Sequence, residues 1–377
     1  MNGLSVSRKR SGALSAPTLF LRLLLWLVLL AGVGEAVARL TLTSPSVQLP
    51  DRQLGYVNQP HAWLFQANEG FETIHLNALG LNNDEVSPTP SGKRLLLIGD
   101  SMLLSHQVPR ERNYPTLLKT STGLDIINGG RDAMGPAQWG IMADRLTPQI
   151  HPDYDVMMMS RGDAFDLLDA DVRFQSDGPG LGHIHVLLKP DPRDFVQDHF
   201  GPALRQSAML TFLARRANLY VKGITTGDSW LGYTLRGFRK RPPTRNETAG
   251  FPSERITEQL AQLMRIAQYR QKTIFISIPS LVYHAHGVSE LEPRSRIEHD
   301  IFPEAARRAG VPFIDLGPDM QADYARHQIP LNGFANSQIG TGHLNEYGHL
   351  VIARLIAPRL PDLMAQADLA HARAMTN

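Results

Sequence analysis

A serine and a histidine far apart in the chain give the strongest chemical signal in the sequence. Ser101 ends the run RLLLIGDS (residues 94–101), in which apolar residues typical of a buried strand lead into a short polar turn. Ligand sites of open α/β sheets lie at the carboxyl ends of strands, so Ser101 is a candidate nucleophile if a base reaches it. An ordinary turn is the alternative interpretation, and a second Gly-Asp-Ser at residues 227–229, with no apolar run before it, is expected to be a loop.

The candidate base is His343, in the run TGHLNEYGHL (residues 341–350). This run precedes an apolar-periodic helix that is expected to reach about Leu360. A loop histidine before the last helix of such a sheet lies at the same edge as Ser101. A lone histidine is usually structural, but its pairing with a strand-end serine favours a shared site with Ser101 as nucleophile and His343 as general base.

Five short apolar runs separated by helical patterns predict the sheet that positions these residues. The expected strands cover residues 94–98, 124–128, 154–159, 273–278 and 311–316. Helices are expected after the cap residue Asn113 and from Pro252 to Tyr269. Alternation of this kind predicts one parallel sheet covered on both faces, in a domain spanning residues 93–365.

The third and fourth strands are separated by far more chain than one crossover needs, so an insertion is expected at about residues 171–250. It contains a predicted helix from Leu204 to Tyr220 and a basic, aromatic-containing stretch from Trp230 to Pro243. That stretch either contacts an anionic glycan or lipid head groups or is a solvated loop.

Residues 1–40 carry a basic triplet followed by an apolar segment from about Leu19 to Ala38. That length spans a bilayer, so a cytoplasmic stub and a single transmembrane signal-anchor in the inner membrane are expected, with the remainder in the periplasm. A signal peptide cleaved near Ala38, releasing a secreted protein, is the alternative. Residues 41–92 are expected to be an extended segment packed on the domain, and residues 366–377 a C-terminal tail.

Composition excludes several other functions. A net charge of +2 over 377 residues argues against a nucleic-acid surface. The absence of cysteine excludes disulfides and thiolate metal sites. The 14 histidines show no metal-ligand spacing, so neither a metal nor a cofactor is expected.

Three blocks in this order resemble those of the SGNH (GDSL-type) hydrolases, especially membrane-anchored bacterial members. They are GDS (99–101), NGGRDAMGPAQ (128–138), and HLN with the following GH (343–349), and the resemblance covers roughly residues 54–360 without the insertion. It implies a flavodoxin-like three-layer α/β/α sandwich with a five-stranded parallel sheet. It also implies an esterase, lipase, carbohydrate deacetylase or acyltransferase without a cofactor.

The resemblance assigns the oxyanion hole to Ser101, Ala133 and Gly162. Ala133 replaces a glycine of the family, and its backbone N–H remains a donor. Gly162 replaces an asparagine, which removes a side-chain donor whose loss typically lowers the rate by about 10²–10³.

The aspartate that orients the histidine in the family should lie two or three residues before His343, where the chain has Thr341 and Gly340. Disruption of the third triad member lowers the rate by about 10⁴ in serine proteases. One expected compensation is a Ser-His dyad whose imidazole is held by a backbone carbonyl. The side chains that the sequence offers as further support for the site are Asp163, Asn345, Glu346 and Arg161.

The expected function is therefore a serine esterase or O-acyltransferase that acts on an acyl ester of an exported glycan or polysaccharide. The alternative is an impaired, SGNH-like pseudoenzyme that serves as a glycan-binding or assembly module of an envelope polysaccharide machinery. Retention of Ser101 and His343 favours the enzyme, while Gly162 and Gly340 favour the pseudoenzyme.

Overall fold

A five-stranded parallel sheet forms the centre of the computed structural model. The structure describes residues 16–40, 47–169 except 52, 68 and 91, 172–187 except 177, 179, 180, 182 and 183, 201–214 and 250–376. The strands of the sheet are β5 (Arg94–Gly99), β6 (Asp125–Asn128), β7 (Tyr154–Ser160), β10 (Thr273–Ile278) and β13 (Phe313–Asp315). Their order is β13-β10-β7-β5-β6, so the five predicted strands are all confirmed in one sheet.

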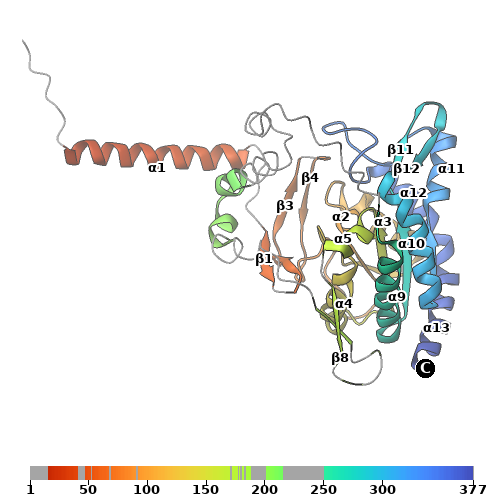
Figure 1. Ribbon diagram of the computed structural model, residues 1–377. Helices are drawn as coiled ribbons and strands as arrows, with labels where there is room; N and C mark the ends of the chain where they lie inside the picture. Colours follow the sequence, from red (N-terminus) through yellow and green to blue (C-terminus); the bar gives the residue numbers. More distant parts are fainter. Residues whose placement is uncertain are drawn as a thin grey trace, which may run out of the picture.

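Helices cover both faces of this sheet (Figure 1). One layer contains α4 (Pro136–Ile150), α5 (Asp163–Asp169), α9 (Ser253–Arg270) and α10 (Pro293–Ala309). The other contains α3 (Tyr114–Thr122), α11 (Gly317–His327), α12 (Glu346–Ile356) and α13 (Leu360–Thr376). Successive strand side chains point to opposite faces, so Leu96 packs in the first layer and Leu97 in the second. The three-layer sandwich predicted from the sequence is confirmed.

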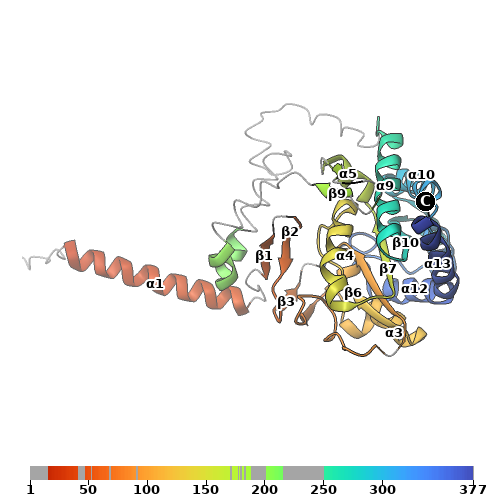
Figure 2. The same cartoon turned by 90° about the horizontal axis from the view of Figure 1, so that it is seen from below.

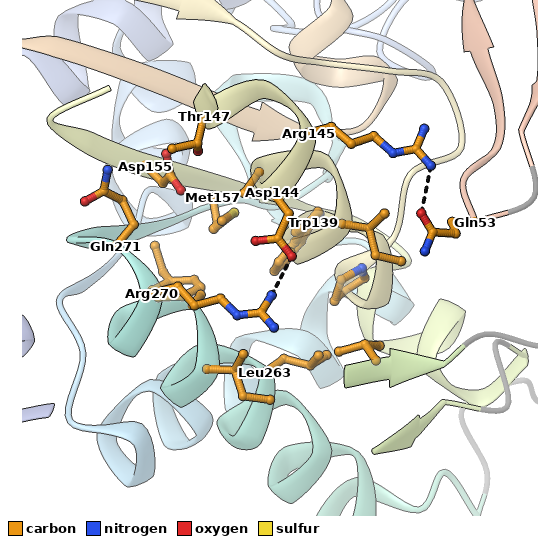
Figure 3. A pocket seen from close by; sticks show the side chains of 18 of the residues that line it. Gln53, Trp139, Asp144, Arg145, Thr147, Asp155, Met157, Leu263, Arg270 and Gln271 are labelled. Carbon is orange, nitrogen blue, oxygen red and sulfur yellow. Dashed lines mark hydrogen bonds and ion pairs between the residues drawn. The ribbon is translucent and has the colours of Figure 1, made fainter. Parts of the chain in front are cut away.

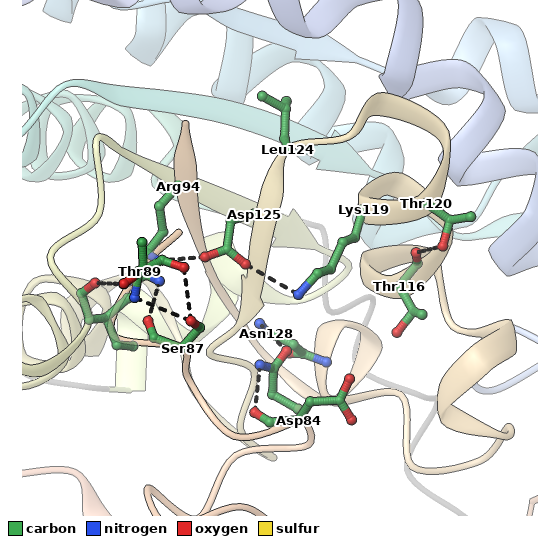
Figure 4. Close-up of polar contacts among 12 residues, drawn as sticks. Asp84, Ser87, Thr89, Arg94, Thr116, Lys119, Thr120, Leu124, Asp125 and Asn128 are labelled. Atoms are coloured by element: carbon green, nitrogen blue, oxygen red, sulfur yellow. Dashed lines mark hydrogen bonds and ion pairs between the residues drawn. The ribbon is translucent and has the colours of Figure 1, made fainter. Parts of the chain in front are cut away.

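A buried ion pair joins the first two strands at their amino ends, away from Ser101 (Figure 4). Arg94 is 3% exposed, and its Nε donates to the Asp125 carboxylate at 2.7 Å. Lys119 Nζ donates to the second oxygen of that carboxylate at 3.2 Å, and Arg94 Nη2 donates to the Ser87 carbonyl at 2.6 Å. Arg94 and Asp125 are register partners of β5 and β6, so the cluster fixes this pairing and the chain entering it.

Small antiparallel hairpins surround the sandwich. The segment before the sheet forms β1 (Gln48–Asp51) with β2 (Gly55–Asn58) and β3 (Trp63–Gln66) with β4 (Glu72–His75). Two further hairpins are β8 (Arg173–Ser176) with β9 (Ile184–Leu187) and β11 (Leu281–Tyr283) with β12 (Ser289–Leu291). Upstream of them, α1 (Ala16–Leu40) is a 25-residue helix that is long and apolar enough to cross a membrane.

The prediction of a C-terminal tail at residues 366–377 is wrong. Helix α13 continues to Thr376, and Ala367 and Ala370 are buried. Gln268 of α9 donates a side-chain hydrogen bond to the Ala367 carbonyl at 3.0 Å. Helix α13 is therefore packed on the domain along its length. Residues 227–229, the basic stretch 230–243 and the end of the predicted helix 204–220 lie outside the described residues.

A cavity of about 610 Å³ lies between α4 and α9 over one face of the sheet (Figure 3). Trp139, Met157 and Leu263 supply apolar lining, and Asp155 supplies a carboxyl group that is 2% exposed. Burial, with a smaller contribution from the charge of Asp144, raises the pKa of Asp155 from 3.8 to about 7. The cavity is lined by neither Ser101 nor His343, so it is separate from their site.

The raised pKa of Asp155 predicts a pH-dependent stability. The folded chain keeps this proton across the window from 3.8 to about 7, where the unfolded chain loses it, so stability falls as pH rises through that window. Asp155→Asn is expected to remove this dependence. The free energy of unfolding of the variant, minus that of the native chain, should therefore increase as pH rises. Denaturant unfolding of both full chains in micelles, near pH 4 and near pH 7, measures the difference, and an offset independent of pH would contradict it.

Candidate active site

Ser101 is held at the carboxyl end of β5, as the first residue of the short helix α2 (Ser101–Leu104). The preceding Asp100 holds the turn: its carboxylate accepts hydrogen bonds from the Met102 N–H at 2.9 Å and from the Ser160 hydroxyl at 2.6 Å. Burial raises the pKa of Asp100. The Ser101 side chain stays half-buried at the sheet edge where the sequence placed it.

His343 reaches this serine from a loop near the other end of the chain. Its Nε2 lies 2.8 Å from Ser101 Oγ, across 242 positions of sequence. The Gly333 N–H donates to the His343 carbonyl at 2.9 Å, and the Asn332 side chain donates to the Gly342 carbonyl at 3.0 Å. These bonds fix the loop, and the structure brings together the two residues that the sequence singled out.

The second histidine of the same block is part of the core. His349 is 1% exposed, and its Nδ1 accepts a hydrogen bond from the Tyr114 N–H at 3.4 Å. Burial lowers the pKa of His349 to about 3, so its ring is neutral near pH 7. It links α12 to α3 and takes no part in the site.

The carboxylate that the sequence lacks just before His343 is supplied by Glu69, in the turn between β3 and β4. Glu69 Oε2 accepts a hydrogen bond from His343 Nδ1 and lies 3.3 Å from the His343 backbone nitrogen. With Nδ1–H donated to Glu69, Nε2 is the acceptor that faces Ser101 Oγ. The three side chains therefore have the arrangement of a nucleophile, a base and an orienting carboxylate.

The turn that carries Glu69 is fixed by contacts with the loop that leads to His343. Asn336 accepts a hydrogen bond from the Gly70 N–H at 3.0 Å and donates to the Gly70 carbonyl at 2.7 Å. Gly70 has φ +71°, and a Cβ there would lie 2.1 Å from the Gln107 carbonyl oxygen. Only glycine fits this position, so the placement of Glu69 is built into the backbone of the turn.

A glycine next to His343 makes the room that Glu69 occupies. A Cβ at Gly342 would lie 2.1 Å from Glu69 Oε1, and the backbone there has φ +78°. Gly340 has a similar φ of +84°, but its closest neighbour is Tyr283 Cδ2 at 3.3 Å. The loop that lacks the family's aspartate thus leaves space for a carboxylate from another part of the chain.

Ala133 lies in the loop between β6 and α4, with φ +54° in the left-handed region. The neighbouring Asp132 carbonyl accepts a hydrogen bond from the Tyr56 hydroxyl of β2 at 2.8 Å, which ties the loop to the N-terminal segment. Within the described parts of the chain, no acceptor is bonded to the Ala133 N–H. That N–H is available to a ligand, and its oxyanion role beside the Ser101 N–H stays a prediction.

The prediction that Gly162 joins the oxyanion hole is wrong. Its N–H donates to the Glu298 carboxylate at 2.8 Å, and the same oxygen accepts from the Ala164 N–H at 3.1 Å. Burial raises the pKa of Glu298 to about 8. The buried Glu298 side chain of α10 therefore binds the backbone N–H of Gly162, the residue that replaces the family's asparagine.

Two of the predicted supporting residues serve the local backbone. Asp163 is buried and accepts a hydrogen bond from the Ser160 N–H at 2.7 Å. Burial, with the charge of Asp100 second, raises the pKa of Asp163 well above its usual value. Asn345 caps α12 by accepting from the Gly348 N–H at 2.9 Å. Both side chains shape the site's edge without holding the imidazole.

The other two predicted supporting residues form ion pairs at the surface. Arg161 Nε lies 2.8 Å from the Glu292 carboxylate, and Glu346 pairs with Arg112. Neither pair includes His343, so Glu346 does not replace the missing aspartate here. The notion that Arg161 is an oxyanion donor stays a prediction. Sequence reasoning missed Glu69, for which the chain gives no local motif.

No protein-family model and no curated protein matches the chain. Solved structures with a similar fold include a member of the lipolytic G-D-S-L family from Veillonella parvula, at 12% identity and TM-score 0.38, with 70% of this chain and 95% of that chain covered. Others are a psychrotrophic esterase from Pseudoalteromonas sp. (11%, TM-score 0.34, 73% and 97% covered) and an acetylxylan esterase from Geobacillus stearothermophilus (12%, TM-score 0.34, 71% and 94% covered). The chain is similar to solved structures of SGNH, or G-D-S-L-type, hydrolases.

Proposed function

We propose that the protein is a serine esterase of the SGNH type, with Ser101 as nucleophile, His343 as general base and Glu69 as the residue that orients the imidazole. The observation that carries this proposal is the unbroken line of hydrogen bonds from Ser101 Oγ through His343 to Glu69. The alternative of a pseudoenzyme rested on the missing carboxylate and on Gly162, and Glu69 removes the first of these two reasons.

In the proposed reaction, His343 Nε2 takes the hydroxyl proton as Ser101 Oγ bonds to the carbonyl carbon of an ester. The tetrahedral intermediate collapses, the bond to the leaving alkoxide breaks, and His343 returns the proton to it. His343 then takes a proton from water as its oxygen attacks the acyl-enzyme. The bond from the carbonyl carbon to Ser101 Oγ breaks, His343 returns the proton to Oγ, and the carboxylic acid leaves. Glu69 orients the ring and stabilises the imidazolium that forms in each half-reaction.

The negative oxygen of the intermediate needs donors that are already in place. The proposal assigns the backbone N–H groups of Ser101 and Ala133 to this role. Gly162 supplies none, so the site is expected to work with backbone donors alone. One missing side-chain donor typically lowers the rate by about 10²–10³, which predicts a slow esterase rather than an inactive one.

The proposed substrate is an acyl ester on a glycan. It is proposed to lie outside the cytoplasm, because α1 follows the basic residues that keep its amino end inside. The chain is accordingly proposed to be a single-pass protein of the inner membrane, with its catalytic domain in the periplasm. Transfer of the acyl group to a sugar hydroxyl, in place of water, is the acyltransferase form of the same chemistry.

Turnover of model esters by the full chain in detergent micelles tests the proposal. Release of p-nitrophenol from the acetate ester, abolished in Ser101→Ala, supports the esterase. Adding an oligosaccharide acceptor then separates hydrolysis from transfer, because transfer produces an acylated sugar visible by mass spectrometry. A folded chain that binds an acetylated polysaccharide without releasing acetate would overturn the esterase in favour of the pseudoenzyme.

The space beside His343 gives a matched pair of variants. Both Gly342→Ala and Gly340→Ala strain a backbone with positive φ, but only alanine at 342 collides with Glu69. We expect kcat for ester hydrolysis to be roughly 10–10²-fold lower in Gly342→Ala than in Gly340→Ala, because the carboxylate is displaced. Equal rates in the two variants, with similar unfolding midpoints, would show that the carboxylate in this space does not matter.

A further inference from the structure

The end of α1 nearest the catalytic domain is docked against residues 201–214, which we call the juxtamembrane segment. This segment is helical at 201–206 and 208–214, and it lies beside that end of α1 in both views (Figures 1 and 2). It also contacts the domain, because Arg205 Nη1 donates to the carbonyl of Gln48 in β1 at 3.4 Å. The segment thus joins the candidate membrane helix to the rest of the protein.

A carboxylate near the end of α1 is satisfied by the juxtamembrane segment. Glu35 accepts hydrogen bonds from the Ser207 hydroxyl at 2.7 Å and from the N–H groups of Ala208 and Met209 at 3.0 Å each. It also pairs with Arg39, whose Nη2 donates to the Gln206 carbonyl at 3.1 Å. A carboxylate in an apolar helix is costly at a membrane unless it is paired, and here four donors surround it.

Close packing supports the same contact. A Cβ at Gly34 would lie 2.5 Å from Met209 Sδ, so the helix approaches the segment at a residue without a side chain. Gly32, two residues earlier, has nothing within 4 Å of such a Cβ. The contact is therefore confined to one side of α1.

The juxtamembrane segment also exposes apolar side chains beside the end of this helix. Leu210, Phe212 and Leu213 are 39%, 40% and 52% exposed, while Ala208 is fully buried. If α1 crosses a bilayer, Glu35 and Arg39 mark the boundary between lipid and water at this end, because α1 has no charged residue between Arg22 and Glu35. The exposed apolar side chains then lie at the level of the head groups, where amphipathic helices bind.

We infer that α1 is retained as an anchor and that the juxtamembrane segment rests on the bilayer surface, with Leu210 and Leu213 in the head-group layer. This inference rests on the proposed membrane location, not on the proposed chemistry. Cleavage near Ala38 would remove Glu35 and leave the N–H groups of residues 208 and 209 without their partner. Contact of the juxtamembrane segment with the bilayer fixes the distance of the catalytic domain from the membrane. This arrangement suits substrates that are presented at the membrane surface.

A single fluorophore tests the position of the segment, because the native chain has no cysteine. Full-length Leu213→Cys and a control, Leu369→Cys, are labelled with an environment-sensitive dye in phosphatidylcholine–phosphatidylglycerol vesicles. Leu369 is 60% exposed on α13, which lies in the same helical layer as α3 and α12. We expect a blue-shifted emission and quenching by brominated lipid at 213 only. Identical spectra at 213 and 369 would overturn the inference.

Disulfide formation tests the contact itself. Gly34→Cys with Met209→Cys is expected to cross-link in the vesicles, whereas Gly32→Cys with Met209→Cys is expected to remain reduced. Equal cross-linking of both pairs, or of neither, would overturn the docking. The intact mass of the purified native chain shows whether residues 1–38 are present, and their loss would refute the anchor. Ester hydrolysis by the same samples is measured separately, so failure of the membrane contact is distinguishable from failure of the esterase.

Discussion

Glu69→Gln is expected to lower kcat for ester hydrolysis by about 10³–10⁴, with little change in the folded structure. Glutamine has nearly the same shape as glutamate, but it carries no charge to stabilise the imidazolium of His343. Its amide can also turn its NH₂ group towards Nδ1 and favour the wrong tautomer of the ring. In the serine-protease case, the corresponding change of aspartate to asparagine lowers kcat by about 10⁴.

A control on the same hairpin separates this effect from a loss of folding. The side chain of Glu72, at the start of β4, accepts one hydrogen bond, from the Thr73 N–H, among the contacts of the described chain, so Glu72→Gln should keep native kcat. Since Glu69 is proposed to act through His343, its variant should also change the pH dependence of kcat/KM, which a merely structural residue would not do. Rates of Glu69→Gln within about threefold of the native chain would exclude its orienting role.

Removal of Ser101 or His343 is expected to have the largest effect of all. Each alanine variant should lose up to about 10⁶ in kcat, as in serine proteases, and the double variant should be no slower than either single one, because the two residues act as a unit. Turnover of p-nitrophenyl acetate by the three variants measures this. Ser229→Ala, in the second Gly-Asp-Ser, is the matched control and should keep native activity. Losses that multiply in the double variant would show that the two residues act independently.

The sheet was predictable because its strands are buried on both faces and therefore form continuous apolar runs. The runs at 94–98 and 273–278 match β5 and β10 to within one residue. The last expected helix ends at about Leu360, so α13 was not predicted. Its buried positions beyond residue 365 are Ala367 and Ala370, and the weak hydrophobicity of alanine gives little periodic signal.

Ser101 and His343 were predictable from position, because the ends of parallel strands and the loops that follow them share one edge of the sheet. Ala133 was assigned through the resemblance to the family; it lies in the loop after β6, and its oxyanion role stays a prediction. The prediction for Gly162 failed because it depended on alignment with the family. Sequence alone does not show that Glu298, from a helix far along the chain, would bond to that N–H.

Glu69 was not predictable from the sequence. It lies 274 positions from His343, in a segment expected only to pack on the domain's edge. The one signal in the chain is indirect: the loop before His343 has Gly340 and Thr341 where the family has a carboxylate, and Gly342 leaves the space that Glu69 fills. The missing carboxylate of the motif indicates that another residue must orient His343, but only the fold identifies that residue as Glu69.

The central claim is that Ser101 is an activated nucleophile, and covalent labelling of the full chain by a fluorophosphonate probe tests it most directly. The predicted result is one adduct, mapped by peptide mass spectrometry to Ser101, that is lost in Ser101→Ala and His343→Ala and forms much more slowly in Glu69→Gln. No adduct in a folded native chain, or an adduct on a different serine, would contradict the proposed site.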